Sequence, residues 1–199
     1  MDMDRTYRVG ILLFDEAEVL DFAGPFEAFS ITKLADGRRP FSVYTIAEHD
    51  WLIKARNGLL VQPNYTFLDT PELDVFIIPG GYGAKKIEIH NEKLIRFIQE
   101  TAARTPLTAS VCTGAFLLAQ AGLLNGKTAT THWLDTEDLQ HHFPDVHVVT
   151  GVRFVDQGSI MTSGGVSSGI HMSLHIVRKL LGEDVAKSAA RRMEYDIVF

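Results

Sequence analysis

Cys112 is the residue whose type and position most directly suggest chemistry. It is the only cysteine among 199 residues, and it stands where the apolar run Leu107–Val111 meets a helix-like pattern that continues to Ala119. A turn from a strand into a helix exposes its central residue to the unpaired N–H groups of the first helical turn. Those groups favour an anion, which predicts a thiol pKa below the ~8.5 of free cysteine and hence a candidate nucleophile. Free cysteine is also among the most buried residue types, so a small inert core residue is the alternative.

Four further candidates stand where elements of the predicted fold begin or end. Gly80 and Gly81 follow one strand-like apolar run, His132 follows another, and Asp21 stands at the start of a helical pattern. Ligands of open parallel sheets bind at the carboxyl ends of the strands, so we expect Cys112, the glycine turn and His132 at one edge. By position alone, Asp21 is most simply a helix N-cap.

The elements that must position these residues alternate between strand and helix, which is typical of an α/β protein with a mostly parallel sheet. The patterns predict strands at 7–14, 39–47, 59–62, 74–78, 107–111, 127–131, 146–149, 152–155 and 159–162. They predict helices at 20–29, 91–104, 113–119, 135–143, 163–181 and 182–192, with Pro25 near a helix start and Asn91 as a cap. No repeat, low-complexity tract or linker divides the chain, so we expect a single domain over 1–199.

Composition excludes several classes of function. The net charge is −6 and the pI is about 5.7, which argues against nucleic acid as a partner because duplex binding needs a concentrated basic face. One cysteine cannot form an internal disulfide, and the N-terminal residues lack the basic start and apolar stretch of a signal peptide. No apolar run approaches the ~20 residues that span a bilayer. We therefore expect a cytoplasmic protein with no membrane partner.

Five blocks in the chain resemble the ThiJ/PfpI superfamily, and within it the isonitrile hydratase branch. They extend in the same order from the first predicted helix to the last long one, so the resemblance covers nearly the whole chain. The blocks are Leu20-Asp-Phe-Ala-Gly-Pro25, Ile78-Pro-Gly-Gly-Tyr-Gly83, Val111-Cys-Thr-Gly114, Thr130-Thr-His-Trp133 and Thr162-Ser-Gly-Gly-Val-Ser-Ser-Gly-Ile170. The resemblance implies a flavodoxin-like three-layer α/β sandwich with a nucleophile elbow, usually as a homodimer.

The resemblance also implies an activity, namely a cysteine-dependent hydro-lyase that adds water to an isonitrile and releases an N-substituted formamide. Carried over residue by residue, Cys112 would be the nucleophile and Asp21 the general acid and base. The chemistry needs this pair, because a thiolate can add to the isonitrile carbon, which then takes a proton, and the resulting thioimidate needs an activated water. An aspartate that faces a thiolate in a partly dry site should have a raised pKa. No cofactor is implied, and the partner is a small electrophilic substrate.

The other residues of the blocks would complete the site. The Thr113 hydroxyl would hold the sulfur or the substrate nitrogen, and the N–H groups of Gly80 and Gly81 would receive negative charge, as in an oxyanion hole. His132 and Trp133 would line the pocket wall. The alternatives are ordinary first-turn helix chemistry for the threonine, a turn with positive φ for the glycines, and a hydrogen-bonded structural histidine.

Some residues of the chain differ from those of other branches of the superfamily, which narrows the choice of branch. Thr113 stands where the protease-like branch has a histidine, and Asp21 stands where the deglycase and glyoxalase branch has a glutamate. His171 stands where related sequences commonly have an aspartate, which leaves the polarity of the pocket open. His171 and His175 lie four residues apart on one predicted helix, but no third ligand is indicated, so we expect no metal site.

Two other function classes stay open. This superfamily also supplies the N-terminal halves of AraC-type transcription regulators, which would make the chain a ligand-sensing domain. Because no helix-turn-helix segment follows before Phe199, we expect it not to be a complete regulator. The other class is a redox-stress or glyoxalase-like protein in which Cys112 is oxidised to a sulfinic acid.

Overall fold

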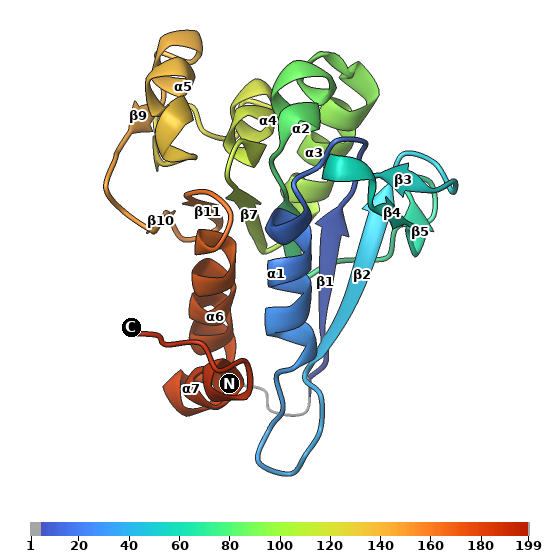
Figure 1. Cartoon of the computed structure of the whole chain (residues 1–199), viewed down its shortest axis with the longest axis vertical. Helices are drawn as coiled ribbons and strands as arrows, with labels where there is room; N and C mark the ends of the chain where they lie inside the picture. Colours follow the sequence, from blue (N-terminus) through green and yellow to red (C-terminus); the bar gives the residue numbers. More distant parts are fainter. Residues whose placement is uncertain (1–4, 199) are drawn as a thin grey trace.

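The computed structural model describes residues 5–198, and Figure 1 labels its elements. Seven strands form the central sheet in the order β10-β11-β7-β6-β1-β2-β5. They are β1 (Tyr7–Leu12), β2 (Phe41–Ala47), β5 (Tyr65–Thr66), β6 (Val75–Ile78), β7 (Leu107–Val111), β10 (Phe154–Asp156) and β11 (Ile160–Ser163). Neighbouring strands pair in parallel except β10, which runs antiparallel to β11.

The remaining elements surround this sheet. Two small sheets pair β3 (Ile53–Lys54) with β4 (Leu60–Val61) and β8 (Thr128–Ala129) with β9 (His147–Val148). The α-helices are α1 (Val19–Ser30), α2 (Tyr82–Lys86), α3 (Glu92–Arg104), α4 (Gly114–Gln120), α5 (Thr136–His142), α6 (Ser168–Leu181) and α7 (Glu183–Arg192). Short 3-10 turns occur at η1 (Arg56–Gly58), η2 (Glu88–His90) and η3 (Trp133–Asp135).

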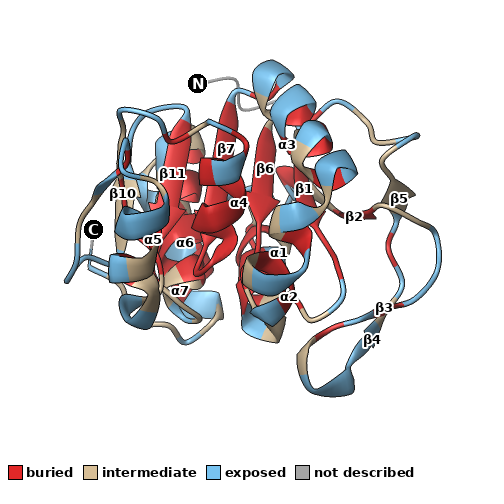
Figure 2. Ribbon diagram, turned by 90° about the horizontal axis from the view of Figure 1, so that it is seen from above, coloured by how far each residue is buried: buried red, intermediate tan, exposed pale blue. Residues whose placement is uncertain are grey.

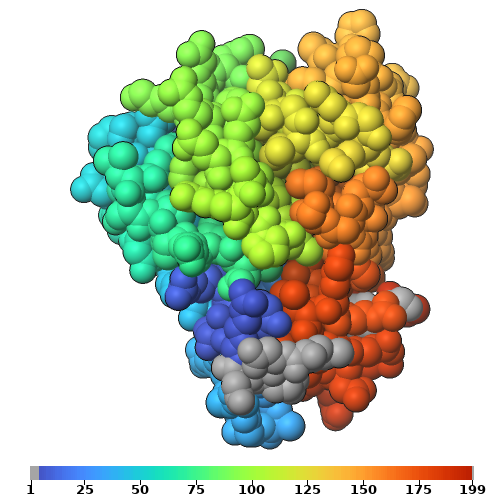
Figure 3. All heavy atoms as spheres, turned by 180° about the vertical axis from the view of Figure 1, so that it is seen from behind, coloured from blue at the N-terminus to red at the C-terminus, as the bar shows by residue number. Residues whose placement is uncertain are grey.

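Helices cover both faces of the sheet. α6 packs against α1 and α7, and α4 packs against α2 and α3. Figure 2 shows buried strands in the middle and exposed outer surfaces on the helices. On the face drawn in Figure 3 the green surface around α3 adjoins the yellow surface that follows α4. Gln99 of α3 joins these segments, since its Nε2 donates to the Ala121 carbonyl at 3.1 Å. This arrangement confirms the predicted flavodoxin-like α/β sandwich. No helix in residues 5–198 is long and apolar enough to cross a membrane.

Two inner strands of the sheet, β6 and β7, are buried along their whole length because helices cover both of their faces. Strands that alternate with helices in a parallel sheet have this pattern, whereas a strand with one face in water alternates between apolar and polar residues. The sheet is therefore a rigid platform, and the loops at its carboxyl edge are the parts free to carry chemistry.

Strand register places three loops level with one another at that edge. Ile78 of β6 pairs with Ser110 of β7, and Val111 of β7 pairs with Ser163 of β11. The chain therefore leaves β6, β7 and β11 at the same height. The order of the strands also reverses between β1 and β6, and such a switch point is where open α/β sheets bind ligands.

The structure differs from the sequence predictions in several elements. Neither β3 nor β5 was predicted, although β5 is an edge strand of the central sheet. The helix predicted over 163–181 begins at Ser168. Pro25 lies well inside α1 rather than near its start. Only Thr128–Ala129 of the predicted strand 127–131 is extended, and it pairs with β9 outside the central sheet. The five-residue helix α2 was not predicted, because the glycine turn that precedes it gives no periodic signal. The predicted cap of α3 is confirmed, since the Asn91 side chain accepts from the N–H groups of Lys93 and Leu94.

Candidate active site

Cys112 occupies a sharp turn between β7 and α4. Its φ of 56° lies in the left-handed region, which costs a non-glycine residue about 1–2 kcal/mol. Two hydrogen bonds fix this turn, one from the Cys112 N–H to the Ser163 carbonyl at 3.1 Å and one from the Thr131 hydroxyl to the Cys112 carbonyl at 2.8 Å. Gly114 lets α4 begin close to β6, because a Cβ there would lie 2.3 Å from the Ile78 carbonyl oxygen. The turn has the elbow geometry that the sequence predicts.

Asp21 lies beside this elbow rather than at the end of its own helix. It is fully buried in the first turn of α1, whose N-cap residue is Glu18. Its Oδ2 accepts a hydrogen bond of 3.1 Å from the Gly80 N–H, and its carboxyl group also interacts with the Cys112 thiol. Its Oδ1 has no hydrogen-bond partner that meets normal geometry among the described residues. The N-cap interpretation of Asp21 is therefore wrong, and one carboxyl oxygen is left open beside the thiol.

Burial raises the proton affinity of both groups. It raises the pKa of Asp21 from 3.8 to about 7, an effect that the Gly80 N–H opposes and the charge of Glu18 increases. Burial also raises the pKa of the Cys112 thiol well above its usual range, and the negative charge of Asp21 raises it further. The predicted rise for Asp21 is confirmed. The prediction that the pKa of Cys112 falls is wrong. Cys112 is only 7 % exposed, and the loss of water around its sulfur outweighs the stabilising N–H of Thr113.

Thr113 and the glycine turn are bound to one another. The Thr113 hydroxyl oxygen accepts from the Gly81 N–H at 2.9 Å, and the same hydroxyl lies 3.2 Å from the Gly81 carbonyl as a donor. The Gly80 N–H is already committed to Asp21. In the resting structure both glycine N–H groups already have acceptors, so they would have to leave Asp21 and Thr113 to receive a developing negative charge. Their oxyanion-hole role stays a prediction. Both glycines position the acid and the threonine, since a Cβ on Gly80 would lie 2.5 Å from the Thr113 nitrogen.

A cavity of about 360 Å³ opens over the thiol. Its lining includes Cys112, Thr113, Gly81 and His132 from the predicted set. Tyr82 and Val166, which the sequence suggests as residues that set the size of the pocket, also line it. The lining residues that were not predicted are Glu18, Arg56, Lys85, Lys86 and Asp135. Glu18 had a sequence signal, because it stands one helical turn before Asp21, whereas Arg56 comes from a loop that carries none.

His132 and Trp133 have different places. The His132 ring lines the cavity and packs on Gly165, where a Cβ would lie 2.1 Å from the ring. Its Nδ1 accepts from the Leu134 N–H at 3.4 Å and lies 3.6 Å from Asp135. The Trp133 side chain is 75 % exposed and does not line the cavity. The structure thus brings His132 toward the thiol but not Trp133, because the 3-10 turn directs consecutive side chains apart.

Ion pairs bind most of the charges at the cavity mouth. Lys85 pairs with Asp135 and Asp138, and so joins α2 to the start of α5. Arg56 pairs with Glu16 at 3.1 Å and lies over the Tyr82 ring. Each of these cations therefore already has a carboxylate partner.

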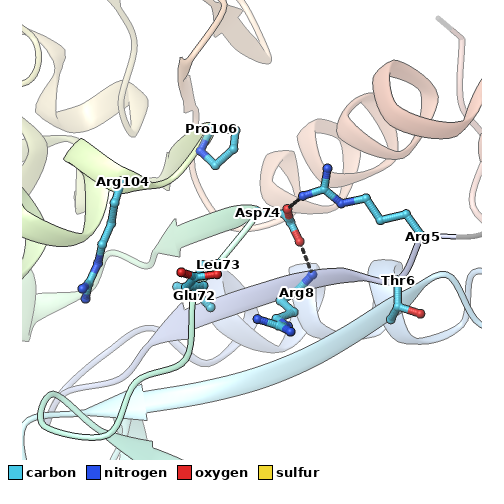
Figure 4. Close-up of a pocket in the computed structure, with 8 residues that line it drawn as sticks. All are labelled: Arg5, Thr6, Arg8, Glu72, Leu73, Asp74, Arg104 and Pro106. Atoms are coloured by element: carbon cyan, nitrogen blue, oxygen red, sulfur yellow. Dashed lines mark hydrogen bonds and ion pairs between the residues drawn. The ribbon is translucent and has the colours of Figure 1, made fainter. Parts of the chain in front are cut away.

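A second, larger cavity lies at the opposite edge of the sheet. It has a volume of about 510 Å³ and is shown in Figure 4, where Arg5 pairs with Asp74 beside the amino ends of β1 and β6. Arg8 and Arg104 also line it. It contains no nucleophile and no buried acid, so the smaller cavity over Cys112 is the candidate active site.

His171 and His175 do not form a metal site. His175 Nε2 lies 3.0 Å from Asp156, whereas His171 is buried near Phe154 and Tyr195. Within residues 5–198 no group of three possible ligands is placed to hold a metal ion. His171 also does not line the cavity over the thiol, so it does not set the polarity of that pocket.

Comparison with known proteins places this geometry in a family. The DJ-1/PfpI family pattern matches residues 7–179. The chain is 35 % identical over 188 residues to an isonitrile hydratase from Pseudomonas putida, covering 94 % of this chain and 78 % of that protein. It is 28 % identical to a solved ThiJ/PfpI family protein from Pseudomonas syringae, with a TM-score of 0.86 and coverage of 98 % of this chain and 77 % of that one.

A regulator also resembles the chain. The HTH-type transcriptional regulator GbdR of Pseudomonas aeruginosa is 26 % identical over 94 % of this chain, and the match spans 50 % of the regulator. Nearly the whole of this chain therefore corresponds to about half of that regulator. The matched family pattern, the similarity to the hydratase and the elbow at Cys112 agree, and the chain belongs to the DJ-1/PfpI family.

Proposed function

We propose that this protein is an isonitrile hydratase-like enzyme that adds water to an isonitrile and releases an N-substituted formamide. One observation carries the proposal. A fully buried carboxyl group, Asp21, has one open oxygen beside the thiol of Cys112 and a pKa of about 7. A carboxyl group with this proton affinity can both accept and return a proton near neutral pH. The 35 % identity to an isonitrile hydratase supports the choice of substrate.

The first half of the reaction moves the thiol proton to the substrate carbon. Asp21, as a carboxylate, takes the proton of Cys112 while the sulfur bonds to the terminal carbon of the isonitrile. The protonated Asp21 then donates the same proton to that carbon, which gives a thioimidate with an S–CH=N–R linkage. A thiol with a raised pKa needs a base of raised pKa, and burial supplies both in one place.

The second half adds water to the thioimidate. Asp21, again a carboxylate, accepts a proton from water as the water oxygen bonds to carbon, and passes that proton to nitrogen. Collapse of the resulting S–CH(OH)–NH–R adduct breaks the carbon–sulfur bond, while the hydroxyl proton returns through Asp21 to sulfur. The products are the formamide and the free Cys112 thiol, so the protein ends as it began.

Two neighbours assist this cycle in the proposal. The Thr113 hydroxyl has one proton, which it donates to the Gly81 carbonyl at rest and can redirect to the Cys112 sulfur when negative charge develops there. His132 borders the cavity and would contact the substituent on the isonitrile nitrogen. Hydrogen bonds that strengthen only as charge develops lower the barrier rather than the ground state.

A ligand-sensing domain is the second candidate. It is favoured by the similarity of nearly the whole chain to one half of a transcription regulator. A sensor would use the same cavity without turnover. The redox-stress alternative has less support, because oxidation needs thiolate and access, and this thiol is buried and has a raised pKa.

The test is turnover of cyclohexyl isocyanide with detection of N-cyclohexylformamide. Wild type should form the formamide, and both Cys112→Ala and Asp21→Asn should lose it. Asp184→Asn is the matched control, since it makes the same substitution at an exposed position of α7 and should keep wild-type rates. No formamide from wild type, with tight saturable binding of a small ligand, would refute the hydratase and favour the sensor.

We also propose that the protein acts as a homodimer. The support is that α1 carries two large apolar residues, Leu20 and Phe26, that are exposed. Sedimentation equilibrium of wild type and of Phe26→Glu tests this, because a charge at a dimer interface would yield a monomer. A wild-type monomer would refute it.

A further inference from the structure

Glu18 is a second carboxylate in the same cavity as the thiol. It is the N-cap residue of α1, one helical turn before Asp21, and its carbonyl accepts the Asp21 N–H at 3.1 Å. Its own N–H donates to the Gly80 carbonyl at 2.9 Å. Gly80 therefore holds both acids, Glu18 through its carbonyl and Asp21 through its N–H. The backbone leaves little freedom in the separation of the two residues.

The Glu18 side chain has no structural task among the described residues. It forms no hydrogen bond that caps α1, although N-cap side chains commonly do so. It also has no ion pair, because Arg56 pairs with Glu16 and Lys85 pairs with Asp135. Glu18 is partly exposed and lines the cavity.

Charged residues from several elements line the cavity together with Glu18. Arg56 of η1 and Lys85 of α2 each pair with a carboxylate. The exposed Lys86 also lines the cavity. His132 and Asp135 also line the cavity. The negative charge of Glu18 disfavours a second negative charge on Asp21.

We propose that Glu18 is an electrostatic positioning residue, which makes Asp21 a strong enough base to take the proton of the buried Cys112 thiol. The inference rests on the proposed acid–base role of Asp21. A thiol ordinarily holds its proton more tightly than a carboxyl group, and burial raises the pKa of both Cys112 and Asp21, so proton transfer from the thiol to Asp21 is uphill. A fixed negative charge one helical turn from Asp21 narrows that gap without touching the substrate.

The experiment compares pH profiles of wild type, Glu18→Gln and Glu27→Gln. Glu27 is the matched control, because it is an exposed glutamate on the same helix and has no contact with the cavity. One readout is kcat/KM for cyclohexyl isocyanide. The other is the rate of alkylation by iodoacetamide, which reports on Cys112 alone because the chain has no other cysteine. Both should rise with pH through the pKa of Asp21, about 7 in wild type.

The part of each pH profile over which the rate rises is called the rising limb. In Glu18→Gln the rising limb should move to lower pH by about one unit, which is the size expected of a like charge one helical turn away at partial exposure. The plateau rate above the limb should fall several-fold, because a weaker base removes the thiol proton less well. Glu27→Gln should keep the wild-type limb. Glu18→Ala should shift the limb in the same direction as Glu18→Gln, which separates charge from shape.

Three results would overturn the proposal. An unmoved limb in both Glu18 variants would mean that the charge of Glu18 does not reach Asp21. A limb that persists in Asp21→Asn would mean that another group titrates. An equal shift in Glu27→Gln would mean that only net charge matters. The pH profile of alkylation could shift as expected in the Glu18 variants while wild type forms no formamide. That result would support the role of Glu18 and refute the hydratase function.

Discussion

Replacing Asp21 with asparagine should stabilise the protein at high pH while it removes activity. A carboxyl group whose pKa is raised from 3.8 to about 7 binds its proton more tightly in the folded state than in the unfolded state. Its contribution to stability is fully present below the unfolded pKa and is lost as pH rises through the folded pKa. The loss is about 1.4 kcal/mol per pH unit, which amounts to about 4 kcal/mol over the whole interval.

The assay is urea unfolding of wild type and Asp21→Asn at several values between about pH 5 and pH 8. Asparagine keeps the shape, and its side-chain oxygen can still accept from the Gly80 N–H, but it does not titrate. Relative to the variant, wild type should lose about 3 kcal/mol of unfolding free energy across this range. That difference corresponds to roughly 6–12 °C in melting temperature for a chain of this size.

Other buried titratable groups do not disturb this comparison. Burial raises the pKa of Glu88 and lowers the pKa of His171, so both change stability with pH. They are present in wild type and variant alike, and their contributions cancel in the difference. Parallel stability curves for the two proteins would refute the reasoning, because they would mean that Asp21 is ionised at no cost in the folded state.

Three further substitutions test the geometry around the thiol. Thr113→Val removes both contacts with Gly81 and should lower kcat/KM about ten- to a hundredfold, whereas Thr113→Ser should retain most activity in the formamide assay. Gly80→Ala would place a Cβ 2.9 Å from Asp21 Oδ2, and we expect a loss of about 1–3 kcal/mol in urea unfolding together with a large fall in rate. Trp133→Ala should change kcat/KM by less than about twofold, because its exposed side chain lies outside the cavity.

The sequence predicted the parts of the site that depend on strand order. Cys112 and Gly80 directly follow continuous apolar runs, and such runs become neighbouring parallel strands whose ends share one edge. The helix start at Asp21 was also visible, but whether its side chain turns back to cap the helix or crosses to Gly80 depends on tertiary contacts. The five-block resemblance, rather than spacing, decided that question.

The remaining features depend on distances that a linear pattern does not contain. The proton affinity of Cys112 was predicted in the wrong direction, because a strand-to-helix turn shows the nearby N–H groups but not the burial that opposes them. The glycine N–H groups were expected to be free, and only the fold shows that Asp21 and Thr113 already accept from them. The cavity residue Arg56 comes from a loop with no periodicity at all.

The elbow at Cys112 also has a consequence for biosynthesis. The two hydrogen bonds that fix it come from Thr131 and Ser163, which leave the ribosome after the cysteine does. At ~5–20 residues per second, translation from Cys112 to Ser163 takes roughly 3–10 s. During that interval the thiol is in water with the reactivity of free cysteine, open to oxidants and alkylating agents. Completion of the last part of the chain therefore protects the nascent protein from damage at the residue on which its chemistry depends.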